Sequence, residues 1–138
     1  MESIELEGQP LDLDLTLACG QAFRWCKREG EVWCGVVGDT LFELRTEGGV
    51  LYWRTFPDGR EALVRDYLRL GDDVNSIYSD LSARDPYLGE VIRRFHGLRL
   101  LRQDPTECLL SFVCTTANNI PKITRSIDEM SRVYGELV

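Results

Sequence analysis

This chain has few of the side chains that support most enzyme chemistry. It contains one histidine, His96, together with five cysteines and two lysines. A Ser-His-Asp triad would need His96 as its base. However, His96 follows a helical stripe and precedes Gly97, a place where a histidine stabilises a helix C-terminus. The carboxylates show no spacing typical of an acid/base pair, so these residues alone predict no hydrolytic site.

The cysteines lack the spacing of a metal or redox motif. No C-x-x-C pair occurs, and a single histidine is too few for a typical zinc site. We therefore interpret all five as small, buried, apolar residues: Cys19, Cys26, Cys34, Cys108 and Cys114. Neither a P-loop nor a dinucleotide-binding glycine motif is present. The sequence predicts no metal and no cofactor.

Length and composition are those of an ordinary globular protein. The 138 residues are 43% hydrophobic and 28% charged, enough for one core or for one small domain and part of another. This composition excludes a collagen, a disulfide-dense miniprotein and a disordered tail. The N-terminus lacks the apolar region of a signal peptide, and no apolar run is long enough to span a bilayer. We expect a protein with reduced thiols, cytoplasmic (nucleoid-associated) or nuclear, neither secreted nor bound to a membrane.

The charge is distributed unevenly along the chain. A net charge of −7 disfavours phosphate binding, which depends on Lys and Arg. However, residues 1–90 carry nine basic and 18 acidic side chains (net −9), whereas residues 91–138 carry seven and five (net +2). Local fields act within a Debye length of about 10 Å. An anionic ligand is therefore expected to meet the C-terminal third.

The first half has the pattern of an antiparallel sheet. Three segments rich in Val, Trp, Phe and Tyr predict strands at about 31–37, 40–46 and 49–56. The turns between them, Gly38-Asp39 and Gly48-Gly49, are typical of tight hairpins. Upstream, leucines alternate with other residues from Leu11 to Leu17, which predicts a strand or an extended lead-in.

Helical periodicity replaces this alternation after Pro57. Asp58 and Glu61 have capping-box spacing and predict the start of a helix. Asp85-Pro86 starts another, whose apolar stripe from Tyr87 to Phe95 is expected to face the core.

The last two predicted helices are strongly apolar on at least one face. Asp104-Pro105-Thr106-Glu107 combines a cap, a first-position proline and a third-position glutamate, and the CLLSFVC run that follows it is apolar on nearly every side. We expect this helix to be buried all round, and the remaining helices provide few partners for it. A final helix at about 120–135 directs Ile120, Ile123, Ile127 and Met130 inward.

Three stretches, read together, resemble the 8-oxoguanine DNA glycosylases. They are LTLACGQAFRW (15–25), GLRLLRQDPTECLLSFVC (97–114) and TTANNIPKIT (115–124), in the order and approximate spacing of that family. The resemblance implies an α+β fold. An antiparallel sheet with helices, a TATA-binding-protein-like N-terminal domain, would occupy residues 1–100. The first helices of an incomplete all-α helix-hairpin-helix glycosylase domain would occupy residues 101–138.

Gly20 is the residue for which the resemblance implies recognition of the damaged base. Oxidation of guanine at C8 turns N7 from an acceptor into an N–H donor, and in this family the glycine of the GQ-x-FRW motif supplies the carbonyl that accepts from it. One such contact is worth about 1–3 kcal/mol. The alternative is a turn glycine that leads into a strand. Arg24 and Arg102, which lie in the matching strings, are expected to connect loops rather than touch the lesion.

The Asn-rich turn is implied to contact DNA. The family inserts an asparagine into the gap left by the flipped base and reads the opposite cytosine with an arginine; ungapped, these fall on Ala117 and Lys122. The candidate DNA-binding residues are therefore Asn118, Asn119 and Lys122. Because lysine lacks the planar fork of arginine, selectivity for the opposite base is expected to be weaker. The alternative is that Asn118 or Asn119 is simply the N-cap of a helix and Lys122 is a solvated surface residue.

The implied activity is excision of 8-oxoguanine from DNA by an N-glycosylase with AP-lyase activity. That mechanism needs a lysine nucleophile and an aspartate in a hairpin region, and neither Lys27 nor Lys122 lies in such a region. We therefore expect no catalytic residue in this chain, which alone would be inactive. The expected partners are double-stranded DNA containing 8-oxoguanine opposite cytosine and a separate C-terminal helix-hairpin-helix half.

Three other functions remain open at this point. One is a non-catalytic module or remnant that binds damaged DNA. Another is a structural interaction domain that pairs through the apolar helix at 108–114. A glycosylase for alkylated bases would share the fold without the GQ-x-FRW chemistry.

Overall fold

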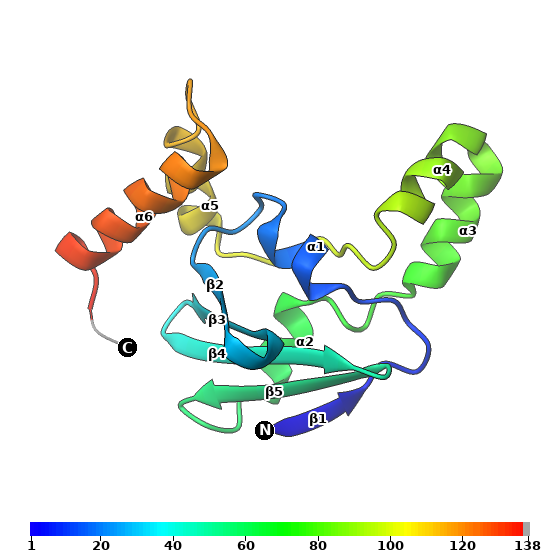
Figure 1. Ribbon diagram of the computed structural model, residues 1–138, viewed down its shortest axis with the longest axis horizontal. Helices are drawn as coiled ribbons and strands as arrows, with labels where there is room; N and C mark the ends of the chain where they lie inside the picture. The colour runs from blue at the N-terminus through cyan, green and yellow to red at the C-terminus, as the bar shows by residue number, and fades with distance from the viewer. Residues whose placement is uncertain (137–138) are drawn as a thin grey trace.

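A five-stranded antiparallel sheet and six α-helices make up the computed structural model, which describes residues 1–136 (Figure 1). The strands are β1 (Glu2–Glu5), β2 (Trp25–Arg28), β3 (Val32–Val37), β4 (Thr40–Glu47) and β5 (Val50–Phe56), in the order β1-β5-β4-β3-β2. The α+β class is thus confirmed, and β1 and β2 are the edge strands. The division into domains at residue 100 remains a prediction.

Both predicted hairpins are present with two-residue turns. Val37 pairs with Thr40 across the β3–β4 turn, and Glu47 pairs with Val50 across the β4–β5 turn. Gly38, Gly48 and Gly49 adopt positive φ angles of 60°, 59° and 82°. Because L-residues avoid this region, glycine at these positions fixes the strand register.

The helices lie at the two ends of the molecule and against the sheet. They are α1 (Leu13–Ala18), α2 (Glu61–Tyr67), α3 (Val74–Arg84), α4 (Pro86–Arg94), α5 (Pro105–Val113) and α6 (Ile120–Tyr134), with a short 3₁₀ turn at Glu29–Glu31. In Figure 1 the α3–α4 pair lies at one end and the α5–α6 pair at the other. None of the helices within residues 1–136 is long and apolar enough to cross a membrane.

The core lies between the sheet and helices α1 and α2. Alternate residues of the central strands, among them Phe42, Leu44 and Trp53, are fully or almost fully buried on this face. Leu17 of α1 and Val64 of α2 belong to the same hydrophobic cluster. Burial of such side chains contributes about 1.5–3 kcal/mol each, so this layer is a firm base for the loops around it.

Helix α1 occupies Leu13–Ala18, so the prediction of a strand or extended segment from Leu11 to Leu17 was wrong from residue 13 onward. The Asp12 carboxylate accepts a hydrogen bond from Leu15 N at 2.9 Å and caps α1. Leu13 and Leu17, four residues apart, then point into the core together. Spacing at i and i+4 is shared by period two and by a helix, and the cap selects the helix.

Two helix starts also differ from the prediction. Asp58 does not cap α2, because the helix begins after Arg60, which has no side-chain capping bond; its backbone N–H donates to Thr55 Oγ1 at 3.4 Å. Helix α3 was not predicted and is capped by Asp73. By contrast, the predicted caps of α4 by Asp85 and α5 by Asp104 are confirmed.

The apolar faces of α4 and α5 are more exposed than predicted. Tyr87 of the α4 stripe is 69% exposed, because α4 packs on α3 through Gly89, whose position faces Ser82. In α5 Leu109, Leu110, Phe112 and Val113 are all exposed, Phe112 at 72%. The expectation that α5 is buried all round was wrong, because these apolar side chains lie at the surface of the described part of the chain. In α6 Ile123 and Ile127 are buried, whereas Ile120 and Met130 are exposed.

Candidate functional site

Gly20 lies in the loop between α1 and β2 and faces the start of α6. Its φ angle is +89°, a conformation that L-residues rarely adopt. A Cβ atom at this position would lie 3.1 Å from Ile120 Cδ1, so the loop and the first turn of α6 are in direct contact across one hundred residues of sequence. Within residues 1–136 no backbone amide donates to the Gly20 carbonyl. Among the described residues this oxygen is therefore an unused hydrogen-bond acceptor.

Gln21 anchors this loop. Its side-chain amide donates to the carbonyls of Thr16 (3.1 Å) and Arg99 (2.7 Å), and its Oε1 accepts from Leu101 N at 3.0 Å. Three hydrogen bonds from one side chain thus join the end of α1 to the segment that leads into α5. The backbone conformation next to Gly20 is held by this bridge.

Arg99 holds the other side of the bridge and is only 3% exposed. Its Nε donates to the Pro10 carbonyl at 2.9 Å, and Nη1 donates to the Arg69 carbonyl at 2.8 Å. Burial lowers the pKa of this guanidinium. The sequence analysis assigned no role to Gln21 or Arg99, because their partners are mostly backbone carbonyls, which leave no mark in the sequence.

Trp25 continues the GQ-x-FRW string into the sheet. Its indole N–H donates to the Tyr67 hydroxyl at 2.9 Å, and its ring lies against the backbone of Gly35, where a Cβ would clash. Burial raises the pKa of Tyr67, which stays a neutral hydrogen-bond acceptor. These contacts fix the strand that follows the Gly20 loop.

The Asn-rich turn leads directly into α6. Asn119 is the N-cap, and its Oδ1 accepts from Lys122 N at 3.1 Å. Asn118 Nδ2 donates to the Cys114 carbonyl at 3.1 Å, and Ala117 has a φ angle of +51°. Asn119 therefore caps the helix, as the alternative interpretation predicted for one of the two asparagines, whereas Asn118 bonds the end of α5; both side chains remain exposed. Lys122 is exposed and takes part in none of the ion pairs found within residues 1–136.

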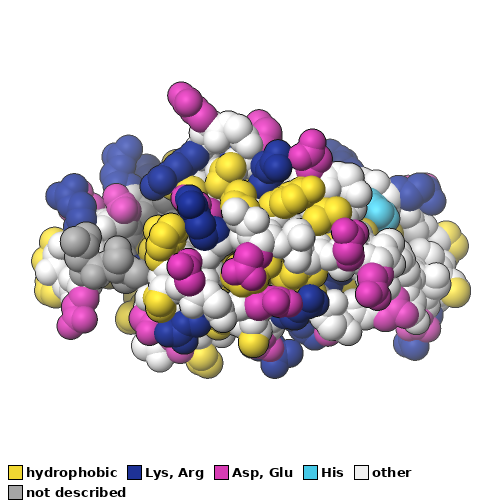
Figure 2. Space-filling view, turned by 90° about the horizontal axis from the view of Figure 1, so that it is seen from below, with side chains coloured by type: hydrophobic (Ala, Val, Ile, Leu, Met, Phe, Trp, Pro, Cys, Tyr) yellow, Lys and Arg dark blue, Asp and Glu magenta, His cyan; other side chains and the backbone are white. Residues whose placement is uncertain are grey.

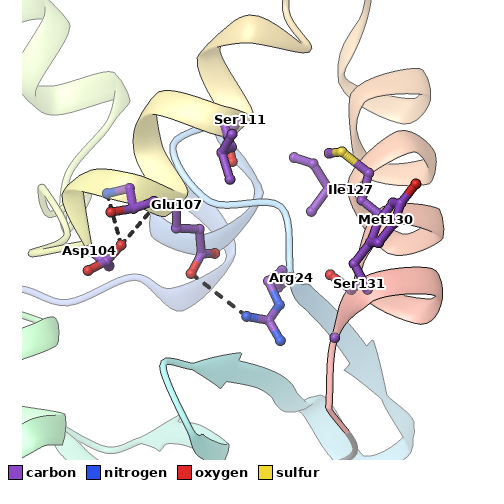
Figure 3. Close-up of a pocket in the computed structure, with 11 residues that line it drawn as sticks. Arg24, Asp104, Glu107, Ser111, Ile127, Met130 and Ser131 are labelled. Carbon is purple, nitrogen blue, oxygen red and sulfur yellow. Dashed lines mark hydrogen bonds and ion pairs between the residues drawn. The ribbon is translucent and has the colours of Figure 1, made fainter.

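Arg24 and Arg102 connect separate segments, as predicted. Arg24 Nη1 lies 3.8 Å from Glu107 Oε2, and Arg102 Nε lies 3.3 Å from Asp66 Oδ1. The first pair lines a cavity of about 370 Å³ between α5 and α6. Figure 3 shows Arg24 and Glu107 pointing toward one another below Ser111, with Ile127 and Met130 of α6 across the cavity. Burial raises the pKa of Glu107, and the charge of Arg24 opposes this shift.

The remaining candidate side chains lie apart from this site. His96 follows the end of α4 in the chain and is exposed (the cyan side chain in Figure 2), and its ring centroid is 5.6 Å from that of Tyr78. Cys34 is buried, but Cys19, Cys26 and Cys108 are exposed and Cys114 is partly exposed, so the expectation of five buried cysteines was wrong. Within the described part of the chain, no three potential metal ligands lie together. Figure 2 also shows basic and acidic side chains interspersed over the face seen from below.

Comparison with known proteins identifies the family. The sequence model of the 8-oxoguanine DNA glycosylase N-terminal domain matches residues 3–109. The chain belongs to the 8-oxoguanine DNA glycosylase family. It is 37% identical over 134 residues to the N-glycosylase/DNA lyase of Arabidopsis thaliana, and 30% identical over 138 residues to a probable N-glycosylase/DNA lyase of Methanothermobacter thermautotrophicus.

Solved glycosylase structures have the same fold. The Clostridium acetobutylicum 8-oxoguanine glycosylase/lyase, crystallised with double-stranded DNA that has cytosine opposite 8-oxoG, superposes with a TM-score of 0.85 at 31% identity over 93% of this chain. The match covers 44% of that protein, and the curated relatives are covered over 37% and 43% of their lengths. This chain therefore spans less than half the length of each of these three relatives.

Proposed function

We propose that this chain forms the lesion-recognition part of an 8-oxoguanine DNA N-glycosylase with AP-lyase activity. In this proposal the Gly20 carbonyl accepts a hydrogen bond from N7–H of an extruded 8-oxoguanine. Normal guanine presents a lone pair at N7 and would face this oxygen with repulsion. A mismatch of that kind in a buried site costs about 1–3 kcal/mol, which is about 5- to 150-fold in discrimination.

The contact between Gly20 and Ile120 is the observation that carries the proposal. It brings a free carbonyl on the α1–β2 loop to the first turn of α6, the segment that begins with Asn119 and Lys122. A base extruded beside this turn would have the Gly20 carbonyl, its hydrogen-bond acceptor, on one side and the DNA duplex on the other. The three bonds of Gln21 hold the loop in place before DNA arrives, as preorganised recognition requires.

The duplex is proposed to lie against the Asn-rich turn. The exposed N-terminus of α6 offers a positive dipole end, and Lys122 adds a mobile ammonium for a phosphate or for the opposite cytosine. Asn118 or Asn119 is proposed to fill the gap that the extruded base leaves in the base stack. Its side chain would then give up its hydrogen bond to Cys114 (Asn118) or Lys122 (Asn119) and bond DNA instead. Double-stranded DNA with 8-oxoguanine opposite cytosine is the proposed partner, which implies action at the nucleoid or in the nucleus.

The nucleophile for base removal is proposed to lie outside these residues. Lys27 is held by Glu31 and Asp14, and both hydrogen bonds raise its pKa and keep it protonated. A protonated amine has no lone pair for attack at the sugar. The exposed apolar side of α5, which includes Leu109 and Phe112, is the surface on which we place a C-terminal helix-hairpin-helix half.

A chimera tests the proposal. Residues 1–138 are joined to the C-terminal portion of the Arabidopsis relative, and the product is incubated with 8-oxoguanine:C duplex and borohydride, which reduces a lysine–DNA Schiff base to a stable adduct. We expect adduct with the lesion duplex and little with a G:C duplex. Residues 1–138 alone and the C-terminal portion alone should give none. A folded chimera without adduct would contradict the proposal.

The exposed side of α5 also favours a second candidate, a structural interaction domain. In that case the isolated chain should form oligomers or hetero-complexes and bind lesion and undamaged duplexes equally. Light scattering, with anisotropy measured on both duplexes at two salt concentrations, separates the two functions. A preference for the lesion without adduct formation in the chimera would instead identify a non-catalytic binding module.

A further inference from the structure

Two cysteines face each other directly across the β2–β3 pair. Cys26 of β2 is the register partner of Cys34 of β3, so both side chains project from the same face of the sheet. Two residues before Cys26, Arg24 lies opposite Val36, and Val36 N donates a hydrogen bond to the Arg24 carbonyl at 3.3 Å. Hydrogen-bonded and non-hydrogen-bonded pairs alternate along an antiparallel ladder, so Cys26 and Cys34 also form a hydrogen-bonded pair. The Cα atoms of such a pair lie about 5.5 Å apart, within the range of about 4.4–6.8 Å spanned by disulfides.

The two thiols differ in access to solvent. Cys26 is exposed and lines a cavity of about 570 Å³ between β2 and α6, which is large enough to admit a small molecule. Cys34 is only 3% exposed, and its burial raises its thiol pKa. Arg28 and Arg54 oppose this shift, whereas Glu43 adds to it. An oxidant therefore reaches the Cys26 sulfur first, and the Cys34 sulfur can react with the oxidised Cys26 afterwards.

The position of β2 at the edge of the sheet allows the small movement that a bond needs. In a hydrogen-bonded pair the opposed Cβ atoms lie toward the upper end of about 4.5–5.5 Å, whereas a disulfide needs about 3.5–4.5 Å. Strand β2 has only four residues and pairs on one side alone, so it can approach β3 without breaking a second ladder. A bond formed under such strain is easily reduced, which suits a reversible modification rather than a permanent staple.

We propose that Cys26 and Cys34 form a reversible cross-strand disulfide site whose reactant is a small-molecule disulfide such as oxidised glutathione. The Cys26 thiolate attacks one sulfur of that disulfide, forms a mixed disulfide and releases one thiolate. The Cys34 thiolate then attacks the Cys26 sulfur and releases the second. Two protein thiols are oxidised and one small disulfide is reduced to two thiols, which take up the two protons.

Peptide mapping of the oxidised protein tests this site. The folded chain is incubated with oxidised glutathione, remaining thiols are alkylated, and trypsin, which cleaves after Arg24, Lys27, Arg28 and Arg45, is added without reductant. We expect peptide 25–27 linked to peptide 29–45, and loss of the link on adding reduced glutathione. Peptide 25–27 carrying only a glutathione adduct after prolonged incubation of the folded protein would overturn the proposal.

Two variants complete the test. Cys26→Ser should abolish the link and leave Cys34 unmodified, because its buried sulfur is not reached directly. Cys108→Ser, which removes an exposed cysteine on α5, should leave the amount of linked peptide unchanged. A second sample oxidised in denaturant should give scrambled links among all five cysteines. Equal scrambling in the folded protein would also contradict the proposal, since the register would then have no influence.

Discussion

Substitution of Gly20 by alanine is the sharpest perturbation of the proposed lesion site. Alanine at a φ angle of +89° costs about 1–2 kcal/mol of backbone strain. The new Cβ would also meet Ile120 Cδ1 at 3.1 Å, but that atom ends a flexible, exposed side chain and can give way. We therefore expect a melting temperature lower by about 4–8 °C, without loss of the fold.

The effect on recognition is expected to be specific to the lesion. When the loop shifts to relieve strain, the Gly20 carbonyl is no longer aligned with N7–H of the lesion. Loss of this hydrogen bond, worth about 1–3 kcal/mol, corresponds to a lesion affinity weaker by about 5- to 150-fold. Fluorescence anisotropy with the chimera measures affinity for 8-oxoguanine:C and G:C duplexes. The ratio of the two dissociation constants should fall toward one.

Gly59→Ala is the matched control. Gly59 has a φ angle of +79° with open space around its Cβ position, so alanine there introduces similar strain in a loop next to α2. It should lower the melting temperature by a similar amount and leave the ratio of dissociation constants unchanged. If Gly20→Ala keeps the wild-type ratio, or if both variants lose it equally, the reasoning about the Gly20 carbonyl is refuted.

Four further predictions concern the surroundings of this site. Gln21→Ala should lower the free energy of unfolding by about 2–4 kcal/mol in urea titration, because three hydrogen bonds are lost and the partly buried Leu101 N–H is left without a partner. A loss below about 0.5 kcal/mol would contradict the bridging role of Gln21. Ala117→Asn and Ala117→Gly should both raise stability by about 0.5–1 kcal/mol, since Ala117 has a φ angle of +51°, and only the asparagine variant should also strengthen lesion binding by the chimera. Hydrogen bonds from Lys27 and Trp33 lower the pKa of Asp14 from its ordinary 3.8, so its contribution to stability is present above that value and is lost as the pH falls through the folded-state pKa. Asp14→Asn should therefore reduce the loss of unfolding free energy at acid pH, and an unchanged pH dependence of stability would contradict this role. Lys122→Met should weaken duplex binding and reduce the slope of log K against log salt by about 0.9, whereas an unchanged slope would remove Lys122 from the phosphate contacts.

Local chemistry was enough to predict strands β3, β4 and β5 and several helix starts, but not the edge strands β1 and β2. The two-residue glycine turns and the apolar alternation act between neighbours, and the Asp caps before Pro86 and Pro105 act within one turn of helix. Helix α1 was not predicted, because leucines at i and i+4 fit both the period of two of a strand and the period of 3.6 of a helix. Only the bond from Leu15 N to Asp12, formed in the fold, separates them.

Long-range contacts could not be predicted from the pattern of residues. The resemblance predicted roles for Gly20 and the Asn-rich turn. However, the contact between Gly20 and Ile120, which follows that turn, joins positions one hundred residues apart and is not visible in the sequence. Gln21 and Arg99 act on backbone carbonyls, which every residue carries. The apolar composition of α5 predicted burial, but burial depends on a covering surface that residues 1–136 do not supply.

The distance between the Gly20 carbonyl oxygen and N7 of the lesion is the most direct measurement of the central claim. It is read from a crystal structure of the chimera, with its catalytic lysine replaced, on a duplex with 8-oxoguanine opposite cytosine. The account predicts about 2.7–3.2 Å, with no protein amide on that oxygen. A separation beyond about 4 Å, or a carbonyl bonded to the protein's own backbone, would contradict it.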